Sequence, residues 1–452
     1  MKDKPRELAL EALVRQGRAP DFSGNYLDSL LCDKQYLDDR DRAFIGNLVQ
    51  GVLRWRARLD FILECHAVQP IEKIDPVILN ILRLAVYQIF FLDRVPDSAA
   101  VNSAVNQARL KKGHGRLVSF VNGILRNICR NKDSIAYPDR KKDLTGFMSR
   151  FYSYPEWLVN RWLKAFGKDF TEDLISAQNN FPDLNIRVNS LKTNRKQLIN
   201  YLADQGINAE PLRFSPEGLR LKDFRGRVER LKPFMDGMFQ VQDQAAQVVS
   251  HLLSPCPGDN IIDICAGFGG KSSHLQELME NRGKVLALDM SFKRLKSHKE
   301  NCRRLGVSNI NPVVANAGES LSWLYKGGFN KALIDAPCSG LGVISRHPDI
   351  KWNKKEGDME RISSLQKKIM EMSFSAVQNG GIVLYAVCSI SREENEEVVE
   401  YLLECNRNIS LVNMKETVPV WGTDLIDNDG FFRTYPNIHH MDGFFAALFK
   451  KE

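Results

Sequence analysis

Residues 260–272 have the sequence Asn260-Ile261-Ile262-Asp263-Ile264-Cys265-Ala266-Gly267-Phe268-Gly269-Gly270-Lys271-Ser272. The apolar run at the start predicts a buried strand, and the glycine-rich turn after it opens a predicted helix. Strands and helices then alternate as far as the C-terminus, with further strands predicted at 284–288, 332–335 and 382–386. This alternation indicates a Rossmann-like α/β domain over residues 241–452, with a parallel, doubly wound sheet.

Two cysteines follow later strands of this predicted sheet. Cys338 stands in Asp335-Ala336-Pro337-Cys338-Ser339-Gly340, and Cys388 stands in Ala386-Val387-Cys388-Ser389. A single cysteine is more often a small buried hydrophobe than a reactive group. Here each cysteine precedes a serine, and Asp335 lies beside one of them. Because the carboxyl ends of parallel strands form the crevice where ligands bind, we expect both thiols in one site, where a thiolate can act as a nucleophile.

The glycine-rich turn at 265–271 is compatible with several interpretations. A phosphate-binding P-loop requires glycine where Cys265 stands, and the glycine spacing does not match the dinucleotide pattern G-x-G-x-x-G. The nucleotide loop of an S-adenosylmethionine enzyme gains support from Asp289, because a carboxylate at the end of the next strand can bind ribose hydroxyls. A glycine-rich turn without a ligand is the remaining interpretation. Asp335 also fits the magnesium-binding aspartate of an NTPase, so the two enzymatic interpretations stay open at this point.

The positive charge of the chain is concentrated in one segment. Residues 101–150 contain 11 Lys and Arg against 3 Asp and Glu, an excess equal to the net charge of +8 of the whole chain. Such a patch is typical of nucleic-acid binding, although a solvated helical face has the same composition. We expect Lys111, Lys112 and Arg116 to contact RNA, together with Arg346 and His347 in a basic, aromatic loop between two strands of the sheet.

Length and composition predict a multidomain protein. A chain of 452 residues is too long for one ordinary core. Residues 1–140 have the apolar periodicity of a helical bundle, and the polar stretch at 131–142 is the best candidate for a linker. Residues 146–240 mix strand and helix patterns and are expected to form a small α+β module that handles RNA. The third expected domain is the catalytic one, at residues 241–452.

Cysteine usage and hydropathy predict the compartment. The nine cysteines show no disulfide framework, and no apolar run is long enough to cross a membrane. We therefore expect a cytoplasmic protein that does not bind membranes, and we expect it to be a monomer. The absence of a Cys-x-x-Cys pair predicts that no metal is bound.

Several motifs carry a resemblance to known families. The N-terminal part resembles the NusB-like RNA-binding domain in Arg40-Asp41-Arg42-Ala43-Phe44, Ser98-Ala99-Ala100-Val101-Asn102 and Phe120-Val121-Asn122-Gly123-Ile124-Leu125-Arg126. The rest resembles the RsmB/Sun (NSUN-related) family of RNA cytosine-C5 methyltransferases in the 265–271 loop, the two cysteine motifs and Arg346-His347-Pro348-Asp349. With a NusB-like N-terminal domain, the chain resembles the bacterial RsmB branch, which methylates small-subunit (16S) ribosomal RNA.

The resemblance implies a role for each motif residue. Cys388 would add to C6 of cytosine, Cys338 would assist release of the methylated product, and Asp335 would contact both cytosine and cofactor. The catalytic set implied by the family also includes Lys271. S-adenosylmethionine would be held by residues of the loop and of the neighbouring strand ends: Cys265, Ala266, Gly267, Phe268, Gly269, Gly270, Lys271, Asp289, Asn316 and Asp335.

Some positions depart from the family pattern. Gly267 and Phe268 stand where the family usually has Ala-Pro, which predicts a more flexible loop and a changed cofactor affinity. Asn316 stands where an aspartate usually faces the adenine, and Val387 replaces a threonine. Two rival functions remain: a P-loop-like NTPase, disfavoured by Cys265, and an RNA-binding scaffold without chemistry. The joint presence of Lys271, Asp335 and both cysteines favours an active methyltransferase.

Overall fold

The computed structural model describes residues 3–17, 27, 30, 31, 34, 36–113, 115–224, 226–321 and 328–452. Its internal contacts divide the chain into two compact units. The first unit comprises Met1–Asn180 with Arg346–Lys354, and the second comprises Phe181–Ser345 with Lys355–Glu452. Residues 346–354 therefore belong to the first unit, although in the sequence they lie between two strands of the second.

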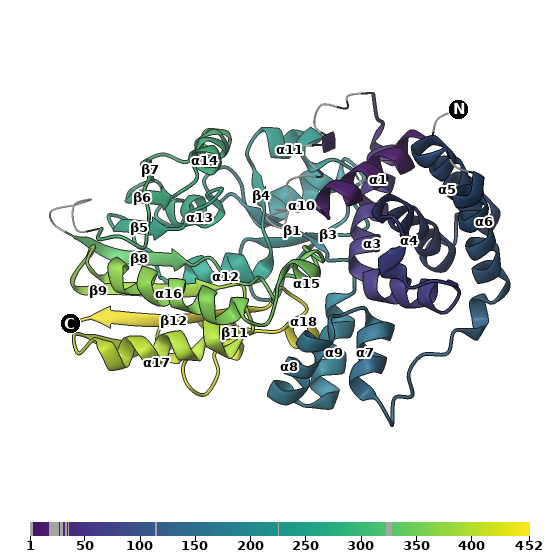
Figure 1. Ribbon diagram of the computed structural model, residues 1–452. Helices are drawn as coiled ribbons and strands as arrows, with labels where there is room; N and C mark the ends of the chain where they lie inside the picture. The colour runs from purple at the N-terminus through teal and green to yellow at the C-terminus, as the bar shows by residue number, and fades with distance from the viewer. Residues whose placement is uncertain are drawn as a thin grey trace. The chain divides into compact units, whose positions relative to one another are not determined.

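The first unit is all-helical in the residues described (Figure 1). Its longer helices are α1 (Lys4–Gln16), α3 (Asp39–Glu64), α4 (Pro76–Phe91), α5 (Asp97–Lys112), α6 (Gly115–Arg130), α7 (Leu144–Tyr152), α8 (Glu156–Phe166) and α9 (Lys168–Gln178). The start of α4 follows from its sequence, because Asp75 accepts hydrogen bonds from the backbone N–H groups of Val77 and Ile78, and Pro76 occupies the first turn. The predicted helical bundle is confirmed.

The core of this bundle includes apolar residues of α3. Leu48, Val52 and Leu59 are buried. A buried ion pair joins α3 to α4, with Arg83 Nε donating to Asp60 Oδ1 at 2.6 Å. Two charges removed from water are stable only when they are paired in this way.

Residues 346–354 are anchored in the first unit by a buried lysine. Lys351, in the short helix α15 (Ile350–Asn353), is 0% exposed. Its ammonium donates to the carbonyl oxygens of Arg54 and Ser153 at 3.1 Å and to Oδ1 of Asn179 at 2.8 Å. Three acceptors match the three donors of an ammonium group, so the lysine of this basic loop stabilises the fold and is not accessible to RNA.

The second unit begins with a four-stranded antiparallel sheet in the order β2-β3-β1-β4. The strands are β1 (Leu184–Val188), β2 (Ala209–Pro211), β3 (Gly218–Leu221) and β4 (Phe239–Val241), with helices α10 (Arg195–Ala203) and α11 (Lys232–Met235). Ile186, Leu198 and Phe239 are fully buried between this sheet and its helices. A mixed module of strands and helices is confirmed here, whereas residues 146–180, at the start of the expected range 146–240, lie in the first unit with helices α7, α8 and α9.

The larger sheet has eight strands in the order β10-β12-β9-β8-β5-β6-β7, and β11 pairs with β12 (Figure 1). The strands are β5 (Asn260–Ile264), β6 (Lys284–Asp289), β7 (Ile310–Val314), β8 (Phe329–Asp335), β9 (Val377–Val387), β10 (Ile409–Val412), β11 (Phe432–Thr434) and β12 (Phe444–Lys451). The connecting helices are α12 (Gln244–Leu252), α13 (Gly270–Leu278), α14 (Phe292–Leu305), α16 (Asp358–Phe374) and α17 (Glu396–Cys405).

The prediction of a parallel sheet is correct for five strands. β9, β8, β5, β6 and β7 are parallel, whereas β10, β11 and β12 pair antiparallel. Parallel strands need helical crossovers between them, whereas antiparallel strands need none. The three antiparallel strands all follow α17, and no further long helix connects them in the described residues 406–452. No helix among the described residues is both long and apolar enough to span a bilayer.

The strand order places a ligand crevice beside β5. From β5 the chain proceeds outward through β6 and β7 on one side, and through β8 and β9 on the other. Where the direction of strand addition reverses in this way, a crevice opens at the carboxyl ends of the strands. Cys265 follows β5, Asp289 ends β6, Asp335 ends β8 and Cys388 follows β9. The fold therefore directs these four candidate residues to one edge of the sheet.

Candidate active site

The two candidate cysteines lie in direct contact. Sγ of Cys338 is 2.9 Å from Sγ of Cys388, with one thiol donating to the other. The strand register accounts for this proximity, because Asp335 pairs with Ala386 across β8 and β9, and each cysteine comes two or three residues later. Both cysteine residues are partly exposed. The structure thus brings two sulfur atoms to the open edge of the sheet.

The thiol of Cys338 holds its proton strongly. The hydrogen bond with Cys388, together with burial and the charges of Glu394 and Asp335, raises the pKa of Cys338 well above its ordinary value. Cys338 therefore remains a thiol near neutral pH and can donate its proton to the sulfur of Cys388. A hydrogen-bond donor beside a thiolate stabilises the ionised form, which is the nucleophilic one.

A third cysteine near the site is chemically different. Burial, together with the charges of Asp335, Asp289 and Asp263, raises the pKa of Cys265 to about 12. Its backbone has a φ of 65°, an uncommon value for a residue other than glycine. At neutral pH Cys265 is a neutral thiol that shapes the loop after β5.

Glu394 connects the two cysteine loops and was not predicted from the sequence. This carboxylate is 0% exposed and belongs to the short 3-10 helix Arg392–Glu394. It accepts hydrogen bonds from the backbone N–H of Ser339 at 2.7 Å, from the hydroxyl of Ser389 at 2.6 Å and from the hydroxyl of Ser339. Because each serine directly follows a cysteine, one buried carboxylate sets the separation of the two sulfurs.

Lys271 and Asp335 form an ion pair at the same edge. Nζ of Lys271 donates to Oδ2 of Asp335 at 2.6 Å and lies 5.4 Å from the centre of the Phe444 ring. Burial opposes the charge of the lysine, but Asp335 outweighs this effect, so the pKa of Lys271 is raised. The side chain of Asp335 stays 33% exposed, which leaves its carboxylate accessible to a ligand.

The glycine-rich loop requires left-handed backbone at two of its glycines. Gly267 has a φ of 56° and Gly269 a φ of 79°. A Cβ atom at Gly269 would lie 2.0 Å from Cδ2 of His298, so no other residue fits there. Gly267, which the sequence predicts to loosen the loop, lies in a conformation that glycine adopts without strain. Phe268 is 49% exposed at the tip of the turn.

Asp289 faces this loop. Its carboxylate accepts from the backbone N–H of Gly267 at 2.9 Å and from that of Ser291 at 2.7 Å. Asn316, the uncharged candidate after β7, is exposed, and its amide group bonds within its own turn to Glu319 and Gly318. The structure therefore joins Asp289 to the loop and leaves Asn316 in a local turn.

The residues around the loop fit S-adenosylmethionine. The carboxylate of Asp289 can accept ribose hydroxyls with its remaining lone pairs, and the N-terminus of α13 presents backbone N–H groups to a carboxylate. Exposed apolar side chains lie at or just after the neighbouring strand ends, namely Met290, Phe292 and Val314. Such side chains suit the flat face of an adenine. Ala266 and Gly270 complete the turn without polar side chains of their own.

Asp263 gives this site a pH-dependent stability. It is 0% exposed, accepts a hydrogen bond from Ser272, and its Oδ1 has no partner among the described residues. Burial, assisted by the charges of Asp335 and Asp289, raises the pKa of Asp263 to about 7. The value in the unfolded chain is about 3.9. The stabilisation by the protonated form is therefore complete below pH ~4 and is lost as the pH rises through about 7.

We expect Asp263→Asn to remove this dependence. Relative to the variant, wild type should lose up to about 4 kcal/mol of unfolding free energy between pH ~4 and ~8, at about 1.4 kcal/mol for each unit of pKa shift. Urea unfolding of both proteins across this range measures the difference. If the unfolding free energies of wild type and Asp263→Asn changed by the same amount with pH, the raised pKa assigned to Asp263 would be wrong.

The candidate RNA-contacting residues belong to the first unit. Lys111 and Arg116 are exposed, and neither has an ion-pair partner in the part of the chain that the structure describes. Lys112 ends α5, but its side chain lies outside the described residues. In the 346–354 segment, His347 is exposed and Arg346 is half-buried.

Comparisons with known proteins identify relatives along the whole chain. Family models match at residues 250–450 ("16S rRNA methyltransferase RsmB/F"), 3–130 ("NusB family") and 154–227 ("Methyltr_RsmF/B-like, ferredoxin-like domain"). A protein of Bacillus subtilis named "Probable ribosomal RNA small subunit methyltransferase B" is 32% identical over 100% of this chain and 99% of its own length. "Ribosomal RNA small subunit methyltransferase B" of an Escherichia coli strain is 31% identical over 98% of this chain and 97% of its own.

Among solved structures, PH0851 is 26% identical, with a TM-score of 0.82 over 99% of both chains. The similarity thus covers the helical unit, the small sheet and the large sheet. The N-terminal helical domain of the NusB type, the ferredoxin-like module and the methyltransferase sheet agree with the predicted fold class.

Proposed function

Because this chain belongs to the 16S rRNA methyltransferase RsmB/F family, we propose that it transfers a methyl group to C5 of a cytosine in 16S ribosomal RNA. The cofactor is S-adenosylmethionine. The observation that carries the proposal is the contact of 2.9 Å between the sulfurs of Cys338 and Cys388 at the open end of β8 and β9. Neither an NTPase nor an inert scaffold requires two thiols in contact at such an edge.

The chemistry of cytosine explains why a thiolate is needed. C5 of cytosine is not nucleophilic until another group has added at C6. The Cys388 thiolate forms a bond to C6, and electron density moves to C5, which then forms its bond to the methyl carbon. S-adenosylmethionine supplies this electrophilic methyl group when it is bound. Cleavage of the bond between sulfur and C6 and transfer of the C5 proton to the neighbouring thiol group then restore the aromatic ring and leave both cysteines as thiols.

The remaining residues assist these steps by proton exchange and positioning. Cys338 hydrogen-bonds to the sulfur of Cys388 before addition. At the end it gives its proton to the departing sulfur of Cys388 and takes up the C5 proton in its place. Asp335 can accept a hydrogen bond from the amino group of cytosine. Lys271 fixes the orientation of Asp335 through their ion pair of 2.6 Å.

Each part of the chain has a proposed task. Residues 1–140 bind RNA, residues 146–240 handle the RNA strand, and residues 241–452 carry out methylation. We place the reaction in the cytoplasm and propose that a monomer performs it without a membrane. The proposal is tested by incubating 16S ribosomal RNA with the protein and methyl-labelled S-adenosylmethionine, followed by mass spectrometry of the nucleosides. We expect label in 5-methylcytidine, whereas label in another nucleoside would overturn the proposal.

Asp289→Ala is expected to weaken cofactor binding by about 10- to 100-fold. The reason is the loss of hydrogen bonds to a charged acceptor, which contribute about 1.5–3 kcal/mol. Isothermal titration with S-adenosylmethionine measures the change. Asn316→Ala serves as the comparison, because the Asn316 amide already bonds within its own turn and its loss should change affinity less than Asp289→Ala does. Equal affinities for wild type and Asp289→Ala would remove Asp289 from the cofactor site.

Reversal of the exposed cations in the first unit is expected to weaken RNA binding. The double variant Lys111→Glu/Arg116→Glu should lower the slope of log K against log salt by about 1–2, since each phosphate contact contributes about 0.7–0.9. Fluorescence anisotropy of labelled RNA at several salt concentrations gives this slope. Lys164→Glu/Lys168→Glu is the control, because it makes the same charge change at exposed positions outside 101–150. If both double variants lowered the salt slope of RNA binding equally, the effect would come from the net charge of the protein and not from the basic segment 101–150.

A further inference from the structure

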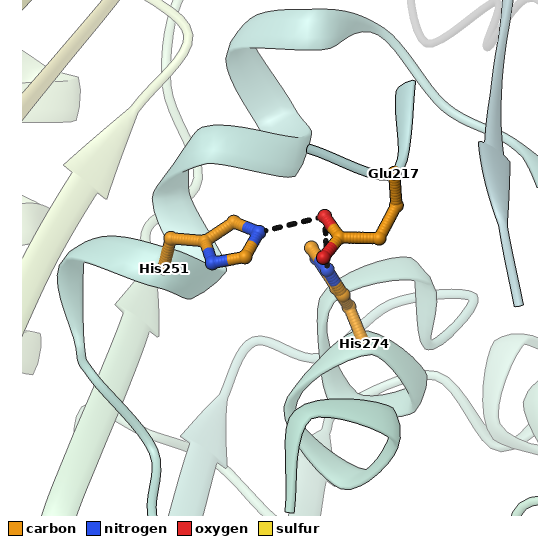
Figure 2. Close-up of side chains that lie close together, drawn as sticks. All are labelled: Glu217, His251 and His274. Carbon is orange, nitrogen blue, oxygen red and sulfur yellow. Dashed lines mark hydrogen bonds and ion pairs between the residues drawn. The ribbon is translucent and has the colours of Figure 1, made fainter. Parts of the chain in front are cut away.

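Three side chains capable of binding a metal converge between the two sheets of the second unit. Glu217 directly precedes β3, His251 lies on α12 and His274 lies on α13. One ligand atom from each lies within 4.8 Å of the others (Figure 2). Nε2 of His251 is 2.9 Å from Oε2 of Glu217, and Nε2 of His274 is 3.9 Å from the same oxygen. Both histidine rings point toward the carboxylate (Figure 2).

His274 has no hydrogen-bond partner, although it is buried. The residue is 1% exposed, and neither ring nitrogen has a partner among the described residues. Burial, together with the charges of Arg187 and His251, lowers the pKa of His274 well below its usual value, so the ring is neutral at pH ~7. A buried polar group without a partner costs about 1–3 kcal/mol. A neutral imidazole directed at a carboxylate is also the form that binds transition metals.

We propose that Glu217, His251 and His274 bind a zinc ion. Zinc bonds to histidine nitrogen and carboxylate oxygen at about 2.0–2.2 Å, so two ligands on a tetrahedral centre lie roughly 3.3–3.5 Å apart. The two separations from Glu217, 2.9 and 3.9 Å, lie on either side of this value, and all three ligand atoms lie within 4.8 Å of one another, so side-chain rotations can bring them together around an ion. Two imidazoles and one carboxylate are ligands that zinc accepts, and a water molecule occupies the fourth position.

The charges around the cluster are compatible with a cation. Arg187 is the nearby positive group, but it is 0% exposed and paired with Glu277, with Nη2 donating to Oε1 at 2.7 Å. The pair is neutral as a whole, and Glu217 supplies a negative charge to the zinc. Trp421 packs edge-on against His251 with ring centres 5.2 Å apart, which restricts access of water on one side.

Zinc at this position would fasten the small sheet to the helix that carries the cofactor loop. Glu217 belongs to the small sheet module, whereas His274 lies on α13, which begins at Gly270 directly after the loop. The ligands are separated by 34 and 23 residues in the sequence, and neither separation matches a zinc motif. The sequence therefore predicts no metal, and only the folded chain brings the three together.

Metal content tests the proposal directly. The full chain, expressed without a histidine tag and with zinc in the medium, is expected to retain about one zinc per molecule after dialysis, as measured by plasma mass spectrometry. Glu217→Gln and His251→Gln should lose this zinc, because loss of a ligand weakens binding more than the 10–100-fold caused by loss of an outer partner. His298→Gln, which removes another buried histidine outside the cluster, should keep it. Circular dichroism confirms that each variant is folded.

A thermal shift supplies the second readout. Removal of zinc with a chelator should lower the melting temperature of wild type, and addition of zinc should restore it, with neither effect in Glu217→Gln. Cobalt added to the zinc-free protein should produce the visible absorbance of a tetrahedral site. The proposal is overturned if wild type holds no zinc and gains no stability from it, or if the variants bind zinc equally well. In either case the three side chains form a cluster without a metal, in which only His251 and Glu217 are hydrogen-bonded.

Discussion

The variant Cys338→Ala is expected to accumulate a covalent complex with RNA that survives denaturing electrophoresis. Cys388 would still add to C6, but without the neighbouring thiol the C5 proton and the sulfur leave slowly. Cys388→Ala should form no complex and should lower the rate of methylation by at least about 10⁴-fold, the loss typical when a nucleophile is removed. The gel is run with 16S ribosomal RNA and labelled S-adenosylmethionine.

The double variant Cys338→Ala/Cys388→Ala is the control for this experiment. It should form no complex, which would attribute the adduct to Cys388 and exclude the remaining cysteines. Cys265→Ala in the Cys338→Ala background should still form the complex, because the Cys265 thiol stays neutral with its pKa raised to about 12. A complex that forms with Cys388→Ala in place of Cys338→Ala would exchange the two roles.

Loss of Glu394 is expected to slow catalysis by about 100-fold, although its carboxylate contacts neither sulfur. Glu394→Ala removes the common acceptor of Ser339 and Ser389 and thereby releases the loops that hold the two cysteines. A displacement of about 1 Å at a reacting group is enough for an effect of this size. Glu394→Gln keeps the volume and one oxygen acceptor, so it should recover part of the rate. Single-turnover methylation at saturating RNA measures the effect on kcat, and KM should change little.

Two controls separate positioning from a general loss of stability. Glu404→Gln makes the same chemical change at an exposed position of α17 and should leave the rate unaltered. The rate of covalent complex formation is then measured with Glu394→Ala in the Cys338→Ala background, at a temperature where the protein is fully folded. A positioning role predicts slow formation of the complex. A normal rate of formation, with only a lowered melting temperature, would assign Glu394 to stability alone.

The sequence predicted the fold and the neighbourhood of the two cysteines because both depend on local patterns. Alternation of strands and helices indicates a parallel sheet, and parallel strands deliver the residues at their carboxyl ends to one edge. Cys338 and Cys388 could therefore be placed near each other without a structure. The antiparallel pairing of β10, β11 and β12 was not predicted. The direction of a strand in the sheet depends on the path of the connecting chain, and the sequence of the strand itself contains little information about it.

Residues that act through tertiary contacts were missed for a physical reason. Glu394 stands in Ser391-Arg392-Glu393-Glu394-Asn395-Glu396-Glu397, a charged run that reads as a solvated surface. Its burial follows only from the packing of β9 against α16 and α17, where Gln366 also donates to it at 3.1 Å. Lys351 follows the predicted RNA-contacting residues Arg346 and His347 closely in the sequence, but the fold buries it. In each case a charged side chain is buried because partners distant in sequence satisfy it.

Mass spectrometry of the covalent complex tests the central claim most directly. The complex formed by Cys338→Ala is digested with protease and nuclease, and the peptide that carries a nucleotide is sequenced by fragmentation. We predict a peptide in which Cys388 bears one C5-methylated cytidine, bonded through sulfur to C6. A nucleotide attached to any other residue, or a base other than cytosine on Cys388, would contradict the mechanism.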